Sequence, residues 1–218
     1  LQEEVLEKRL IRPRAVVRFF PAQGRGDHLV LYDSSRERRE VERFHFPRQA
    51  DGARLCLADF VRPAASGEID YVALFVVTCG AGIRGLSEAL RDKGEYLKSH
   101  ALQALAIESA EGFAELLHER LRSMWGIPDD PKLTVKEKFQ ARYRGIRVSP
   151  GYPACPDLED QAKFWRLLEP AGIGVELTEG FMMDPEASVS ALVFHHPKAR
   201  YFAVGPTSAE AAARGLAC

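Results

Sequence analysis

The chain has 218 residues, of which 46% are hydrophobic and 28% charged, a composition typical of a folded globular protein with room for a hydrophobic core. Thirty basic and thirty-one acidic side chains leave a formal charge of −1, which provides no general basic field for binding nucleic acid. The longest apolar run, residues 72–77, is far shorter than the roughly 20 residues that span a bilayer, so we expect no membrane protein.

The first residues predict a helix that leads into the rest of the chain. Apolar residues recur there at helical spacing, at Leu1, Val5, Leu6 and Leu10. The sequence therefore predicts a lead-in helix over 1–12 and a single domain over 13–218. Because the chain starts with Leu instead of Met and carries no signal peptide, we interpret it as a piece of a longer protein, with N-terminal processing as the alternative.

Short runs rich in Val, Phe, Leu and Tyr follow, separated by turn-forming clusters, and they predict strands. These strands cover residues 15–20, 28–32, 41–46 and 54–61. A continuous apolar run at 71–79 predicts a central strand that is buried on both faces.

The period then becomes helical from residue 86 to about 124, with a break near Gly94. An apolar stripe on the longer part predicts the packed face of this helix. Beside it runs a polar stripe whose pattern alone is typical of a solvated helix face: Glu108, Glu111, Glu115, His118 and Arg122. Thr134, with Glu137 three residues on, predicts the N-cap of another helix that ends near Arg142.

The proline-rich segment 147–156, with sequence RVSPGYPACP, is the least ordinary part of the chain. Its three prolines exclude a helix or a central strand, while Tyr152 and Cys155 are unusual in a linker. A stiff, irregular segment that carries Arg147 and Tyr152 indicates the wall of a ligand site. Residues 160–169 predict a short helix, and three final strands are expected at 175–182, 188–195 and 201–204. Strands, then helices, then strands predict an α+β fold with a mainly antiparallel sheet.

The four cysteines lie far apart and form no C-x-x-C pair, so we predict neither a disulfide framework nor a zinc site. Two of them lie in apolar runs, where cysteine is usually a small buried hydrophobe, and a reducing, cytoplasmic setting fits best. Glu115 and His118 form one E-x-x-H on a helix, whereas a di-iron bundle needs that motif twice. No bound metal is predicted.

Gly80-Ala-Gly82-Ile-Arg-Gly85 matches the pattern G-x-G-x-x-G of dinucleotide-binding folds and Rossmann methyltransferases. In those folds a second strand follows, ending in an acidic residue about 20 residues beyond the motif. That position falls in helical sequence here, at 100–106. The glycines therefore favour a simple strand-to-helix turn, with a Rossmann-type methyltransferase as the less favoured alternative.

Several segments together resemble the activation domain of cobalamin-dependent methionine synthase. Arg147-x-x-Pro150-Gly151-Tyr152-Pro-Ala154-Cys-Pro is similar to the arginine-to-tyrosine motif of that family. The other matching segments, in the family's order, are Cys56-Leu-Ala-Asp59-Phe-Val61, the apolar strand from Tyr71 to Thr78, residues 110–120, Leu177-Thr178-Glu179, Ala187-Ser188-Val189-Ser190 and Tyr201-Phe202-Ala203-Val204. Because they run from about residue 10 to residue 204, the resemblance covers nearly the whole chain.

The resemblance implies a single C-shaped α+β domain, with a twisted, mainly antiparallel sheet and flanking helices, that binds S-adenosylmethionine on its inner surface. Arg147 would bind the carboxylate of this ligand, since an arginine fork matches a carboxylate in two places, and Asp59 would bind its amino group. Glu111 would favour the positive sulfonium over the neutral demethylated product. The remaining binding residues implied by the matching positions are Pro150, Gly151, Tyr152, Ala154, Tyr201 and Phe202.

The function implied is reactivation of a methyltransferase. S-adenosylmethionine would be the methyl donor in the reductive methylation of cob(II)alamin to methylcobalamin, with the cobalamin carried by a separate domain and the electron supplied by flavodoxin or a flavoprotein reductase. The chain would position the sulfonium methyl and would not turn over by itself. Where the family has His, Trp-Pro-Gly and a second Tyr, this chain has Leu158, Asp184-Pro185-Glu186 and Phe202. These departures leave a second hypothesis open, an interaction module of the same fold that has lost its ligand.

Overall fold

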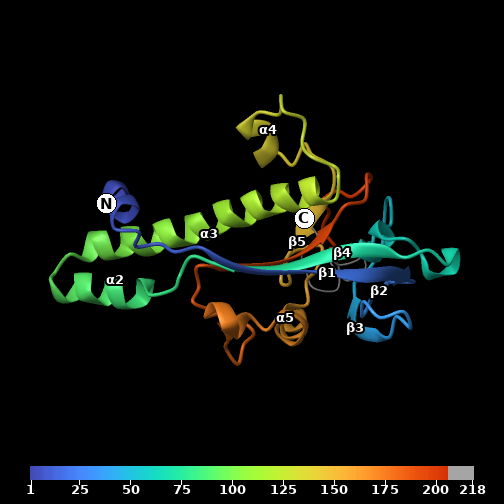
Figure 1. Cartoon of the computed structure of the whole chain (residues 1–218), viewed down its shortest axis with the longest axis horizontal. Coiled ribbons are helices and arrows are strands. Elements are labelled where there is room, and N and C mark those ends of the chain that lie inside the picture. The colour runs from blue at the N-terminus through green and yellow to red at the C-terminus, as the bar shows by residue number, and fades with distance from the viewer. Residues whose placement is uncertain (206–218) are drawn as a thin grey trace, which may run out of the picture.

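A six-stranded sheet in the order β3-β2-β1-β4-β8-β5 forms the centre of the structure, a computed structural model that describes residues 1–205 (Figure 1). Its strands are β1 (Arg14–Arg25), β2 (His28–Tyr32), β3 (Glu40–His45), β4 (Asp70–Thr78), β5 (Ile146–Val148) and β8 (Ser188–Phe194). All five pairings between them are antiparallel. The α+β prediction is confirmed. The Rossmann alternative is excluded, because β4 and the helices after it form no parallel β-α-β unit.

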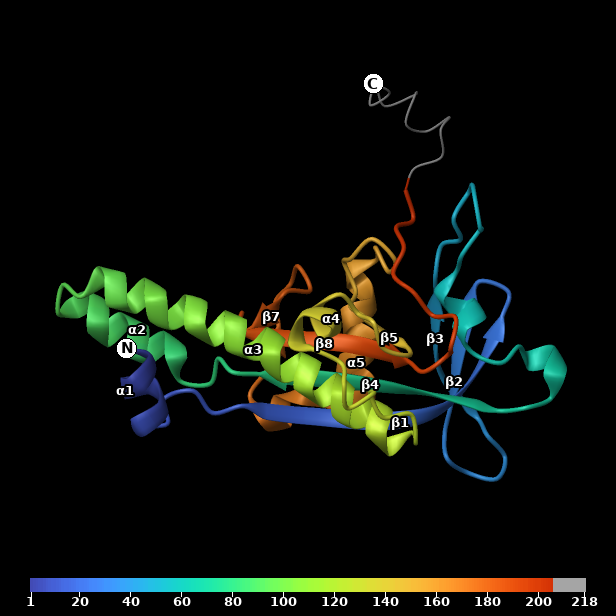
Figure 2. The same cartoon turned by 90° about the horizontal axis from the view of Figure 1, so that it is seen from above.

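The helices lie on both faces of this sheet (Figures 1 and 2). They are α1 (Gln2–Glu7), α2 (Ile83–Asp92), α3 (Tyr96–Met124), α4 (Val135–Phe139) and α5 (Gln161–Leu168), with 3-10 turns η1 (Leu57–Phe60), η2 (Ala64–Ser66), η3 (Leu158–Asp160) and η4 (Pro170–Ile173). The predicted break falls at Gly94, whose φ of 77° lets the chain reverse between α2 and α3. No helix within residues 1–205 has the length and apolarity needed to cross a membrane. The last thirteen positions of the predicted domain, 206–218, lie outside the described residues.

The alternation of β4 separates the hydrophobic core into two layers. Phe75 and Val77 face α3, where small residues such as Ala110 and Ala114 allow the helix to approach closely. Leu74 and Val76 face the opposite layer, which includes Phe44, Phe164 and Phe194. Residues 72–79 are all buried, as expected for a strand covered on both faces, and each such Phe, Leu or Val contributes about 1.5–3 kcal/mol to folding.

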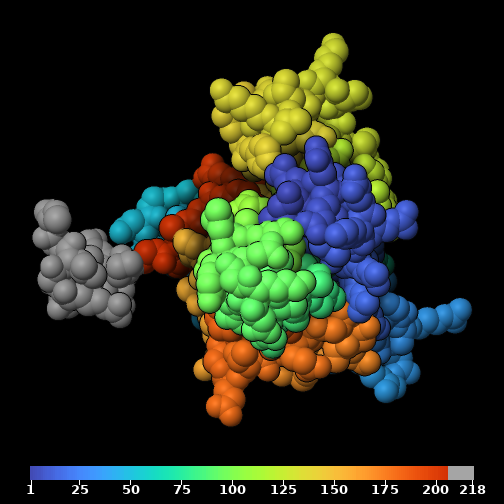
Figure 3. All heavy atoms as spheres, turned by 90° about the vertical axis from the view of Figure 1, so that its left-hand side faces the viewer, coloured from blue at the N-terminus to red at the C-terminus, as the bar shows by residue number. Residues whose placement is uncertain are grey.

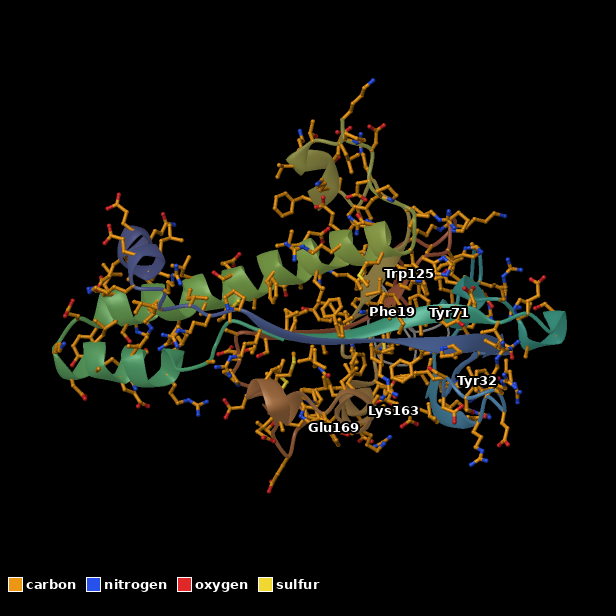
Figure 4. The ribbon with its side chains drawn as sticks, viewed as in Figure 1. Phe19, Tyr32, Tyr71, Trp125, Lys163 and Glu169 are labelled. Atoms are coloured by element: carbon orange, nitrogen blue, oxygen red, sulfur yellow. The ribbon has the colours of Figure 1, made fainter. Side chains whose placement is uncertain are left out.

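The side-chain view shows the same two layers (Figure 4). Phe19 of β1 lies against Trp125, the C-cap of α3, with ring centroids 5.1 Å apart in an edge-to-face arrangement. Lys163 and Glu169 lie below the sheet, and the Lys163 ammonium sits 5.0 Å from the centroid of the Phe44 ring. The end of α3 is therefore anchored to the sheet by aromatic contact, close to where the chain leaves for α4.

Three predicted strands are wrong. Residues 54–61 contain η1 (Leu57–Phe60) instead of a strand, and they pack so tightly on β1 that a Cβ on Gly24 would lie 2.5 Å from the Ala58 carbonyl oxygen. Residues 175–182 form only β6 (Glu176–Leu177), which pairs with β7 (Met183–Asp184) around a tight turn at Phe181. Residues 201–204 form no strand; a backbone bond from Val204 N–H to the Pro153 carbonyl, 2.8 Å, fixes them instead.

Two glycines of the G-x-G-x-x-G stretch, Gly80 and Gly85, have different structural roles, and alanine substitution is expected to change stability in opposite directions at the two positions. Gly80 is buried, and a Cβ there would lie 2.6 Å from the Pro185 ring, so Gly80→Ala is expected to destabilise the fold by about 1–3 kcal/mol. Gly85 lies inside α2 with open space around it, so Gly85→Ala is expected to stabilise by about 1 kcal/mol. Urea unfolding followed by circular dichroism measures both changes. A destabilised Gly85→Ala variant would contradict the open helical position that the structure gives Gly85.

Candidate functional site

A cleft of about 820 Å³ opens between the middle of α3, β5, the proline-rich segment and the β6–β7 hairpin. Its walls include eight of the nine residues that the sequence analysis singled out: Glu111, Arg147, Pro150, Gly151, Tyr152, Ala154, Tyr201 and Phe202. The volume lies in the usual range for sites that enclose a small organic ligand. Residues distant in sequence thus line one cleft, at the edge of the sheet formed by β8 and β5.

The proline-rich segment forms one wall because its backbone is tied into a compact loop. Gly151, with a φ of 88°, turns the chain so that its N–H donates to the Cys155 carbonyl at 2.8 Å. Ala154 and Cys155 point into the core, whereas Tyr152 is 59% exposed. Burial raises the pKa of the Cys155 thiol, which favours the protonated form of a packed hydrophobe. Val204 then pairs with Pro153, and this brings Tyr201 and Phe202 to the rim.

Arg147 is the central side chain of the cleft. It stands on β5 between Ile146 and Val148, which are both buried on the other side of the strand, so its own side chain turns toward α3. Its Nη2 lies 3.2 Å from Glu111 Oε2, and its Nε lies 3.5 Å from Glu115 Oε2. Burial acts to lower the pKa of Arg147, but Glu111, Tyr201 and Glu115 together outweigh it and hold the pKa above its ordinary value. A fixed cation therefore faces the cleft.

A buried polar cluster lies beside Arg147, formed by side chains of α3 and of the segment 127–143. Tyr143 donates from its hydroxyl toward Glu115 Oε2 at 3.4 Å, and its ring packs edge-to-face on His118. The guanidinium of Arg122 lies 3.7 Å from the centre of the Tyr143 ring and forms two hydrogen bonds of 2.7 Å with Asp129. His118 and Arg122 are at most 1% exposed. The solvated face predicted for this stripe is therefore wrong in its second half, because residues 127–143 fold back over it.

Figure 3 shows that excursion from the end of the molecule, as the yellow segment that projects above the helices. Its short helix α4 begins at Thr134 with a capping box to Glu137, as predicted, and Lys138 pairs with Glu119 of α3 at 2.9 Å. The chain then returns to α3 at Tyr143. Only this return brings an aromatic ring over His118 and Arg122, which is why periodicity could not identify the cluster.

Asp59 is the predicted site residue that the structure does not bring to the cleft. It lies on η1, where Arg48 binds its carboxylate, with Nη2 2.9 Å from Oδ1. The neighbouring Phe60 packs on Phe202 with ring centroids 6.2 Å apart. Asp59 thus lies outside the cleft lining and is paired with a cation of its own, Arg48. Its role toward a ligand amino group stays a prediction.

Several residues of the cleft were not predicted as site residues. They are Gln161, Phe181, Met182, Met183, Glu186, Ser188, Val189 and Ser190, with Leu158 also in the wall. Ser190 donates to the Gln161 side chain at 2.8 Å, which fixes the polar floor of the cleft. Their signal in the sequence was the family-like run from Ala187 to Ser190 and the departures at Leu158 and Glu186. The pattern alone did not show that these positions face Arg147.

Comparison with known proteins gives a consistent result. The family described as "Vitamin B12 dependent methionine synthase, activation domain" matches residues 1–214. A methionine synthase of Mycobacterium tuberculosis (strain ATCC 25618 / H37Rv) is 37% identical over 206 residues, which cover 89% of this chain and 17% of that protein. The chain therefore spans about a sixth of the length of this curated relative.

A crystal structure of the MetH reactivation domain bound to AdoHcy is similar in fold as well as in sequence. The TM-score is 0.88 at 36% identity, and the match covers 98% of this chain and 69% of that one. The likeness therefore extends through the sheet, the α2–α3 hairpin and the elements that enclose the cleft.

Proposed function

The chain belongs to the family of vitamin B12-dependent methionine synthase activation domains, and from this premise we propose that its cleft binds S-adenosylmethionine as the methyl donor for reactivating a cobalamin cofactor. The position of Arg147 is the observation that carries the proposal. It presents a fixed guanidinium to a cleft of suitable volume, inside a motif that the family resemblance assigns to ligand binding.

The residues present fit the methionine end of this ligand. Within residues 1–205 the ion pairs of Arg147 use Nε and Nη2, so Nη1 can donate to a ligand carboxylate. Glu111 is exposed beside it and provides a carboxylate for the ligand ammonium or sulfonium. Loss of the tyrosine hydroxyl at Phe202 does not open the wall, since this ring packs on Phe60. The fit supports a retained ligand site over an interaction module without one.

The adenosine end fits the opposite part of the cleft. Gly151, Tyr152 and Ala154 supply backbone groups held by the turn of the proline-rich segment, and they need little ordering when a planar base binds beside them. Tyr152 and Tyr201 are 59% and 51% exposed, so their rings are available for contact with adenine. The chain's role is thus positioning, in which the bound sulfonium is held in one orientation for transfer of its methyl group.

The proposal extends to the rest of such an enzyme. Because the chain spans 17% of its curated relative, we infer that cobalamin is carried by another domain, toward which the cleft opens, and that flavodoxin or a flavoprotein reductase supplies the electron. We also propose a cytoplasmic setting, which is supported by Cys56, Cys79 and Cys155, all buried and not joined to one another.

Calorimetric titration of the chain tests ligand binding directly. We expect saturable, one-to-one binding of S-adenosylmethionine and of S-adenosylhomocysteine, and binding at least ten times weaker for ATP, which has adenosine but no amino-acid end for Arg147 to recognise. Circular dichroism on the same sample checks that the protein is folded. Folded protein that takes up no S-adenosylmethionine at millimolar concentration would contradict the proposed function.

A further inference from the structure

Glu115 is a second carboxylate on Arg147, and the ligand site as described above does not require it. Its Oε2 lies 3.5 Å from Nε, while Glu111 binds Nη2 at 3.2 Å. Nε and Nη2 share one edge of the planar guanidinium, so two carboxylates line the same edge. One carboxylate would be enough to pair with the charge of an arginine, so the second carboxylate adds a negative charge that the pairing does not need.

No neighbouring group neutralises the extra charge of Glu115. Tyr143 donates a hydrogen bond, and burial followed by the charge of Glu115 raises the pKa of this phenol, so it stays neutral. Burial, with the charges of Arg122 and Arg147, lowers the pKa of His118 to about 2, so this imidazole is neutral as well. Arg122 is matched by Asp129. The group formed by Glu111, Glu115 and Arg147 therefore carries a net charge of −1.

The position of Glu115 makes its charge effective at a distance. Its side chain is 23% exposed against 48% for Glu111, so solvent and salt screen it less. Its Oε1 is buried and has no hydrogen-bond partner among residues 1–205. Arg147 is the one cation among the residues that line the cleft within the described chain, and Glu186 on another wall adds a further negative charge.

We propose that Glu115 determines specificity, by giving the Arg147 site the negative charge that favours a cationic sulfonium ligand over its neutral thioether product. The inference rests on the proposed binding of S-adenosylmethionine. Both ligands carry the same carboxylate and ammonium, so the comparison between them isolates the sulfonium charge. At a separation on the order of 10 Å and a dielectric between those of water and the protein interior, one such charge changes the relative affinity about three- to tenfold.

The experiment is the ratio of the two dissociation constants, for S-adenosylhomocysteine and S-adenosylmethionine, in the Glu115→Gln variant. The isosteric amide keeps the size and shape of the side chain beside Arg147 Nε and removes its charge. We expect the ratio to fall three- to tenfold, through weaker binding of S-adenosylmethionine, while the constant for S-adenosylhomocysteine changes less than about threefold. Glu119→Gln is the matched control, one turn along α3 in an ion pair with Lys138 and away from Arg147, and its ratio is expected to stay unchanged.

The outcomes separate this inference from the function on which it rests. If the unsubstituted chain binds neither ligand, the proposed function is wrong. If it binds both and Glu115→Gln keeps the original ratio, the role of Glu115 is wrong and the function stands. A loss of affinity for both ligands by the same factor would also overturn the inference, because it would indicate a structural role. If the Gln variant does not fold, the same ratio is measured in the unsubstituted chain at 50 and at 500 mM NaCl, between which the Debye length changes roughly threefold. A ratio that does not change with salt excludes a charge effect and overturns the inference.

Discussion

Replacing Arg147 with alanine is expected to weaken S-adenosylmethionine binding by about 100-fold, the largest effect of any single substitution in the cleft. The ligand carboxylate would lose its charge-assisted partner in a partly enclosed site, and such a loss costs about 3 kcal/mol. The same change leaves Glu111 and Glu115 facing each other without a cation, so we also expect the free energy of unfolding to fall by about 1–2 kcal/mol. Calorimetry measures the first effect and urea unfolding the second.

Two further variants show whether the fork of Arg147 matters or only its charge. Arg147→Lys keeps the positive charge but lacks the planar donors, so an intermediate loss of about tenfold is expected. Arg144→Ala is the matched control, because Arg144 is exposed three residues earlier and donates to the His195 carbonyl, outside the cleft. If Arg147→Ala binds S-adenosylmethionine as well as Arg144→Ala does, the assignment of the carboxylate site is wrong.

Substitution of Asp129 is expected to give the largest loss of stability among the ionic contacts. Asp129→Ala would leave Arg122, which is 1% exposed, as an uncompensated buried charge, and breaking such a pair costs about 3–5 kcal/mol. The change should also release Tyr143, whose ring lies on the Arg122 guanidinium. The free energy of unfolding from linear extrapolation in urea measures the effect.

A double variant separates the net contribution of the ion pair to stability from the cost of leaving one buried charge without a partner. When Arg122→Met accompanies Asp129→Ala, no charge stays buried, and we expect a smaller loss than in the single Asp129→Ala variant. Lys138→Ala breaks the partly exposed pair with Glu119 on the same excursion, and a change of about 0.2–1 kcal/mol is expected. An Asp129→Ala loss no larger than that of Lys138→Ala would show that the buried pair does not hold residues 127–143 on α3.

The sequence predicted much of the architecture because local chemistry decides it. The apolar run of β4, the reversal at Gly94 and the capping box at Thr134 each follow from neighbouring residues, and all three are present in the structure. Predictions at 54–61 and 201–204 failed for the opposite reason. Those segments are apolar or aromatic enough for strands, but their packing partners, β1 and the proline-rich segment, are distant in sequence.

The site shows the same division. The sequence by itself was enough to identify the family-like motif around Arg147, and eight of the nine residues predicted to bind a ligand line one cleft. Only the fold showed that Asp59 does not line the cleft, because its carboxylate pairs with Arg48. The fold alone also decided that Glu115 is a partner of Arg147. On α3 the side chain belongs to a polar stripe that a solvated helix would show equally well, and its function depends on the return of the chain at Tyr143 and on the register that β8 imposes on β5. Helical spacing specifies which residues share a face of a helix, but which elements cover that face, and with which charges, is decided by contacts between residues far apart in the chain.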